Sequence, residues 1–129
     1  MTCFWDGIII GLEDQKLESE KLIPMKIVQK FKSLANIVPN VLWNNQMLRE
    51  QELKENLERI NNLDINSINN GYDCSCSDPF LFLLANIYKV DIKHNFNGYI
   101  MNYNYIGKDK KDKVLNFQSN RFHFWYVHK

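Results

Sequence analysis

A chain of 129 residues with 45% hydrophobic and 13% aromatic content has the size and the apolar material for one core, so we expect a single domain over residues 1–129. Sixteen lysines and arginines against fifteen aspartates and glutamates give a net charge of +1. This balance excludes the strongly basic character of proteins that wrap nucleic acid, and we expect no nucleic-acid partner.

Cysteine content and the length of the apolar runs indicate the compartment. Three cysteines cannot all pair within one chain, and no charged-then-apolar signal sequence precedes Cys3, so we expect a reducing, cytoplasmic environment. The longest apolar runs are far shorter than the ~20 residues that span a bilayer, so we expect no membrane partner. Abundant asparagine, isoleucine, lysine and tyrosine are typical of A/T-rich genes. A virus, a protist or a low-GC bacterium is the expected source, and for a viral protein the compartment would be the host cytoplasm.

The first apolar stretch predicts a short buried helix. From Phe4 to Leu12 nearly every residue is apolar, and Phe4, Ile8 and Leu12 lie at helical spacing. The isoleucine run would also suit a strand. Glu13 to Lys21 follows as a charged linker.

Two more helices are predicted in the first half of the chain. Pro24 suits a first helical turn, and Pro39 breaks the element that follows it. The apolar stripe of this helix is formed by Ile27, Phe31 and Leu34. The longest helix is predicted for Asn45 to Leu63. Its narrow buried face would consist of Met47, Leu48, Leu53, Leu57 and Ile60.

The second half predicts a central helix and then strands. After the turn-rich stretch Asp64 to Asp73, Ser77 or Asp78 can cap a helix that has Pro79 in its first turn and is apolar on almost every side as far as Tyr88. The apolar period then changes to two. The predicted strands are Val90 to His94, Tyr99 to Ile106 after the Asn97-Gly98 turn, Val114 to Phe117 after the solvated loop Lys108 to Lys113, and Phe122 to Val127. The predicted fold class is therefore α+β, with N-terminal helices packed on a small C-terminal antiparallel sheet.

A thiol near one end of the chain and an imidazole near the other indicate a cysteine nucleophile. Cys3 opens the first predicted helix, and His123 lies among aromatic residues in the last predicted strand. A helix N-terminus and a neighbouring imidazole both favour the thiolate. The alternative is that Cys3 is a small buried hydrophobe and His123 a satisfied strand histidine.

A second group of cysteines and histidines has poor spacing for a metal. Cys74 and Cys76 could reach four zinc ligands only by recruiting both His94 and His128, so we expect no metal and no cofactor. Cys74 or Cys76 could also be the nucleophile of an unrelated arrangement. We interpret His94 as a turn residue and His128 as a solvated one.

Taken in order, these elements resemble the ovarian-tumour-type (OTU) branch of the papain-like cysteine proteases. The best-matching stretch is Gly71-Tyr72 followed by Asp78 to Ile92, because in that family a helix rich in leucine and alanine leads into the strand before the histidine hairpin. Cys3-Phe4 is similar to the family's nucleophile and the bulky residue after it. Asn120 to Phe124 is similar to its polar turn, catalytic histidine and following aromatic. The resemblance covers most of the chain and is strict at a few positions.

This resemblance implies an OTU-like fold and hydrolysis of peptide or isopeptide bonds after ubiquitin or a ubiquitin-like modifier. It makes Cys3 the nucleophile, acting through a thioester intermediate, and His123 the general base. One alternative is an OTU-like module of little or no activity that binds ubiquitin or a host protein. Another is a structural or virion-associated protein.

The chain departs from the family at two places. Only Met1 and Thr2 precede Cys3, where OTU proteins usually carry an Asp-Gly-containing loop that helps to form the oxyanion hole. Trp125 stands two places after His123, where the family often has aspartate or asparagine. Trp125 could shield the imidazole. A carbonyl or another polar residue would then orient it, and the candidates are Asn120, Asp6 and Asn104.

Overall fold

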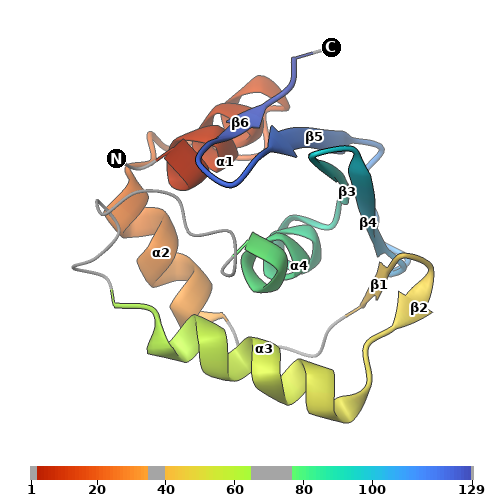
Figure 1. The fold of residues 1–129 in the computed structure, drawn as a ribbon. Helices are drawn as coiled ribbons and strands as arrows, with labels where there is room; N and C mark the ends of the chain where they lie inside the picture. The colour runs from red at the N-terminus through yellow and green to blue at the C-terminus, as the bar shows by residue number, and fades with distance from the viewer. Residues whose placement is uncertain (1–2, 35–39, 65–76, 129) are drawn as a thin grey trace.

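The computed structural model describes residues 3–34, 40–64 and 77–128. Helices dominate the first part of the chain and strands the last part, which confirms the α+β class (Figure 1). The described elements are, in order, α1 Cys3–Asp14, α2 Pro24–Ser33, β1 Val41–Trp43, β2 Gln46–Met47, α3 Glu50–Asn62, α4 Ser77–Tyr88, β3 Asp91–Phe96, β4 Tyr99–Tyr105, β5 Val114–Ser119 and β6 Phe124–Tyr126.

The sheet is mixed and has six strands in the order β2-β1-β4-β3-β5-β6, so the prediction of a small antiparallel sheet was wrong. β3 and β5 pair in parallel, with Asp91 opposite Val114 and Phe96 opposite Ser119. The remaining neighbours pair antiparallel. β4 is antiparallel to β3, so it ends at the edge of the sheet where β3 begins. The loop after β4 remains at that edge, and β5 therefore starts there and runs in the same direction as β3.

A hairpin replaces the start of the longest predicted helix. β1 and β2 pair around Asn44 and Asn45, which have φ angles of 50° and 67°. Asparagine tolerates this left-handed region, and two such residues in a row form the tight turn that hairpins favour. The prediction of a helix from Asn45 was therefore wrong, because α3 begins only at Glu50. Met47, predicted to be buried, is 55% exposed on β2, whereas Ile60 is buried on α3 as expected.

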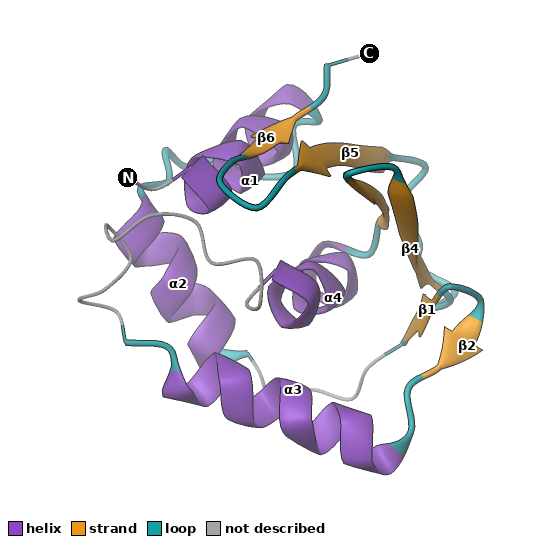
Figure 2. Ribbon diagram, in the orientation of Figure 1, coloured by secondary structure: helices purple, strands orange, loops and turns teal. Residues whose placement is uncertain are grey.

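The predicted central helix is confirmed. α4 spans Ser77–Tyr88 and buries every side chain from Phe80 to Asn86. Figure 2 shows α4 in the middle of the molecule, with the curved sheet on one side and α2 and α3 on the other. A helix enclosed in this way needs apolar residues all round, which is what its sequence supplies. The prediction that Pro24 lies in a first helical turn is likewise confirmed by α2, while Pro39 lies outside the described residues.

The loop between β4 and β5 is solvated, as predicted. Its charges form ion pairs, Lys110 with Asp91 at 2.6 Å and Asp109 with Lys89 at 2.5 Å. These pairs fasten the loop to the end of the sheet where β3 begins. In the described ranges no helix combines the length and the apolar character that a membrane crossing requires.

Candidate functional site

Helix α1 packs against strand β6 (Figure 1). A Cβ atom at Gly7 would lie 3.0 Å from Cδ1 of Phe124, and one at Gly11 would lie 2.9 Å from Cδ1 of Tyr126. Four residues of helix rise about 6 Å, which is close to the rise of two residues of strand. The two elements therefore run in the same direction, and each step of four residues along α1 matches two along β6.

This register brings the beginning of α1 level with the beginning of β6. The rings of Phe4 and Phe124 pack with their centroids 4.6 Å apart. Cys3 is the first residue of α1, and Phe122 and His123 directly precede β6, so all three lie at the end of the α1–β6 pair where both elements begin. Cys3 is half-buried at the helix N-terminus with a free thiol, and His123 is exposed. The two residues predicted from sequence thus come to the same end of the α1–β6 pair.

His123 lies in a turn and not within a strand. The predicted strand Phe122 to Val127 is too long, because β6 covers only Phe124–Tyr126. The side-chain oxygen of Asn120 accepts hydrogen bonds from the backbone N–H groups of Phe122 and His123, both at 2.8 Å. The N–H of Asn120 donates to the carbonyl of His123 at 2.9 Å. Asn120 therefore contacts the backbone of His123, which the sequence alone did not indicate.

The other residues expected to orient or shield the imidazole lie on three different elements. Asp6 is exposed in the first turn of α1, three positions after Cys3 and so on the same side of the helix. Trp125 is 42% exposed on the side of β6 opposite to Phe124, and its shielding role stays a prediction. Asn104 lies on β4, three strands or about 14 Å from β6, which is too far to orient His123.

We expect Gly11→Ala to separate α1 from β6. The new methyl group would meet the Tyr126 ring, whose hydroxyl donates to Asp14 at 2.7 Å and so resists displacement. Overpacking costs about 1–3 kcal/mol, and the better helix propensity of alanine returns up to about 1 kcal/mol. The net loss, about 1 kcal/mol, is measurable by urea unfolding, and the alkylation rate of Cys3 should change with it. Ile10→Ala on the exposed side of α1 is the control, and equal effects of both substitutions would contradict the close-packing argument.

His94 is fully buried on β3, so its interpretation as a turn residue was wrong. Its Nε2 lies 2.6 Å from Oγ of Ser119, and its ring packs on Phe124 with centroids 5.4 Å apart. Nδ1 has no hydrogen-bond partner among the described residues. Burial lowers the pKa of His94 to about 4, against the opposing effect of Asp78, so the ring is neutral at pH 7. The alternation with buried Ile92 was the signal that could have placed it on the inner face of the sheet.

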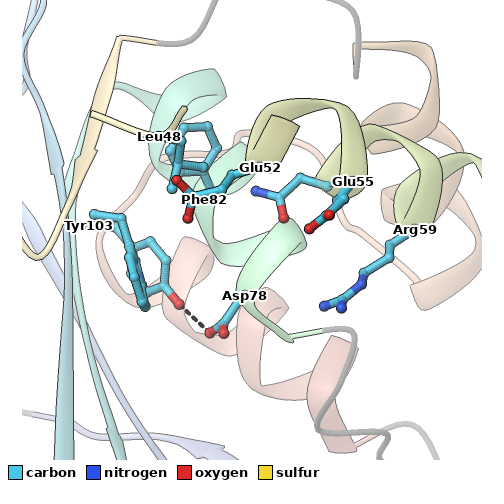
Figure 3. A pocket seen from close by; sticks show the side chains of 9 residues that line it. Leu48, Glu52, Glu55, Arg59, Asp78, Phe82 and Tyr103 are labelled. Carbon is cyan, nitrogen blue, oxygen red and sulfur yellow. Dashed lines mark hydrogen bonds between the residues drawn. The ribbon is translucent and has the colours of Figure 1, made fainter. Parts of the chain in front are cut away.

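A polar pocket of about 130 Å³ opens between β1, β4, α3 and α4 (Figure 3). It is lined by Trp43, Leu48, Glu52, Glu55, Asn56, Arg59, Asp78, Phe82 and Tyr103. Three of these residues are acidic and one is basic. The Tyr103 hydroxyl donates to Asp78 at 2.5 Å, which fixes one carboxylate against the aromatic wall. Carboxylates beside aromatic rings suit a basic group of a ligand.

Sequence reasoning missed this pocket because it considered only the apolar face of the helix that corresponds to α3. Neither Cys3 nor His123 lines it. The first turn of α4 nevertheless borders both places. Asp78 lines the pocket, while the ring of Phe80 packs on Trp5 of α1 with centroids 4.8 Å apart. The pocket and the start of α1 therefore share one supporting helix.

Among the described residues no three histidine, cysteine or acidic side chains are grouped to hold a metal ion. Cys74 and Cys76 lie outside the described residues, so their constellation is not placed. His128 is exposed, as expected, 3.7 Å from a carboxylate oxygen of Asp14.

The described residues place a thiol at the first position of α1 and an imidazole on the turn before β6, the strand on which α1 packs. A separate acidic pocket lies on the other side of the first turn of α4. No family model, no curated protein and no solved structure matches this chain.

Proposed function

We propose that this chain is an OTU-like cysteine protease that cleaves peptide or isopeptide bonds after ubiquitin or a ubiquitin-like modifier. Cys3 is the nucleophile and His123 the general base. The packing of α1 on β6 carries the proposal, because the first turn of the helix and the turn that bears His123 both lie at the end where these two elements begin.

The chemistry assigned to the pair is acyl transfer. His123 takes the thiol proton, and the sulfur attacks the carbonyl carbon of the scissile bond. The C–N bond then breaks as the imidazolium gives its proton to the leaving amine, which leaves a thioester on Cys3. Water activated by His123 hydrolyses the thioester and regenerates the thiol.

The position of Cys3 on its helix suits a nucleophile. Cys3 is the first residue of α1, a helix of 12 residues, and the N-terminus of a helix carries partial positive charge and N–H groups without an acceptor inside the helix. The N–H of Cys3 is itself a candidate donor to the oxyanion that forms on the carbonyl oxygen. The loss of one such donor lowers turnover by roughly 10²–10³.

Exposed aromatic side chains beside His123 support a protein as the substrate. Phe122 is 76% exposed and Trp125 is 42% exposed, and large aromatics are the side chains that anchor protein partners. The carboxylates of the pocket would attract basic side chains of the same partner.

The test is intact-mass spectrometry after incubation with ubiquitin that carries a thiol-reactive C-terminal group. We expect the wild type to gain one ubiquitin and Cys3→Ala to gain none. His123→Ala should react about 10²–10⁴ times more slowly, the range for loss of a general base. His128→Ala is the matched control, because His128 is exposed near the other end of β6.

Two results would contradict the proposal. One is a wild type that stays unmodified by ubiquitin and by ubiquitin-like probes alike. The other is a Cys3→Ala variant that still reacts, since the thiol would then be Cys74 or Cys76.

The second candidate function is a binding module with little or no catalysis. Two observations favour it, namely Trp125 at the usual place of the histidine-orienting residue and a pocket that includes neither Cys3 nor His123. Ubiquitin binding that survives Cys3→Ala, together with no adduct in the wild type, would select this function.

A further inference from the structure

We propose that Asn120 is a positioning residue for His123 and that it acts through the backbone of the turn. This inference rests on the proposed function, because it concerns how the general base is held. The side-chain oxygen of Asn120 accepts the N–H groups of Phe122 and His123 at 2.8 Å each. The return bond, from the N–H of Asn120 to the carbonyl of His123 at 2.9 Å, closes the turn.

These contacts exclude the more obvious way for an asparagine to orient a histidine. An amide oxygen has two lone pairs, and both are used by backbone N–H groups. The oxygen therefore has no lone pair left for an imidazole N–H. What the side chain fixes is the path of the main chain at His123, and hence the point from which the imidazole leaves it.

Both ends of the turn are anchored in the protein. On one side, Ser119 is buried with its hydroxyl 2.6 Å from Nε2 of His94, and its carbonyl accepts the N–H of Asn97 at 3.2 Å. On the other side, His123 is followed by Phe124, whose ring packs on Phe4 of α1. Asn120 is the link between these two anchors, so a turn with exposed side chains still has a defined backbone.

The expected consequence is a change in the reactivity of Cys3. A general base that is held near the thiol acts at a high effective concentration, and loosening the turn lowers that effective concentration. Without the side-chain oxygen of Asn120, two N–H groups lose their acceptor and His123 spends less time beside the thiol. Cys3 then reacts more slowly with an electrophile.

The experiment measures the alkylation rate of Cys3 by iodoacetamide at pH 6 and at pH 9. Mass spectrometry of the tryptic peptide that contains Cys3 keeps the reactions of Cys74 and Cys76 apart. In the wild type we expect the rate at pH 6 to remain within about tenfold of the rate at pH 9. In His123→Ala it should fall by a further factor of about 10 or more, as for an ordinary thiol.

The quantity compared between variants is the ratio of the alkylation rate of Cys3 at pH 6 to that at pH 9. In Asn120→Ala this ratio should lie closer to the His123→Ala value than to the wild-type value. Asn120→Asp keeps an oxygen acceptor at the same position and should restore most of the wild-type ratio. Gln118→Ala, an exposed position on β5, is the control and should leave the ratio unchanged. Urea unfolding of each variant separates loss of the fold from loss of positioning.

The outcomes separate this inference from the proposed function. If wild type and His123→Ala share one pH dependence, the cysteine–histidine pair itself is wrong. If His123→Ala differs but Asn120→Ala behaves as wild type, the pair stands and the role of Asn120 is wrong. If Asn120→Asp is as impaired as Asn120→Ala while both remain folded, the acceptor role of the side-chain oxygen is overturned.

Discussion

Replacing Phe80 by alanine is expected to cost about 4 kcal/mol of unfolding free energy, within the range for deleting a fully buried aromatic ring. Phe80 is 0% exposed on α4. Its ring lies 4.8 Å from that of Trp5 on α1 and 6.1 Å from that of Phe31 on α2, measured between centroids. The cavity would therefore open where three helices meet, and such a loss is a large share of the stability of a typical domain.

Urea unfolding followed by tryptophan fluorescence measures this loss, and Trp5 reports directly on the cavity. Phe122→Ala is the matched control, because it removes the same ring from a side chain that is 76% exposed. Its expected cost is below about 0.5 kcal/mol, as for most surface substitutions. A Phe80→Ala variant no less stable than Phe122→Ala would mean that α4 does not lie at the centre of the core.

The helices that could be predicted from sequence are those whose signal is local. α4 has a proline in the first turn and apolar residues on all sides, and α1 and α2 have apolar residues at helical spacing. Each of these patterns fixes an element without reference to the rest of the chain. The Asn97-Gly98 turn is of the same kind, and both residues have the positive φ angles that such a turn requires.

The errors concern features decided by distant contacts. β1 is a strand because Leu42 and Trp43 pair with Asn104 and Tyr103 of β4, some sixty residues later in the chain. The parallel pairing of β3 with β5 likewise depends on which end of the sheet the intervening loop occupies. The local spacing of apolar residues indicates neither of these two pairings. An antiparallel sheet and a longer helix were therefore what the sequence predicted.

The candidate site divides in the same way. Cys3 and His123 stand out by residue type, and their position at one end of α1 and β6 depends on the register set by Gly7 and Gly11. Asn120 could be named from the sequence as a candidate to orient His123, but its two contacts with the backbone of the turn could not. The acidic pocket joins residues from four elements, so its carboxylates could not be told from a solvated helix face.

Acid is expected to weaken the fold through His94. Burial lowers the pKa of this histidine to about 4 in the folded protein, whereas in the unfolded chain it keeps its ordinary value near 6.5. Between these two values the unfolded chain binds a proton that the folded protein does not. Stability therefore falls as the pH drops from 6.5 towards 4, by about 3 kcal/mol for a shift of this size.

Urea unfolding at intervals from pH 7 to pH 4.5 measures this slope. His94→Gln removes the titrating group and should flatten the slope between pH 6.5 and 4.5, even if the variant is less stable at pH 7. His128→Gln removes an exposed histidine and should keep the wild-type slope. Asp78 opposes the shift of His94, so Asp78→Asn should extend the loss of stability to lower pH, because the imidazolium would lose a nearby negative charge. A wild-type slope that His94→Gln leaves unchanged would show that carboxylates, and not the buried imidazole, account for the acid sensitivity.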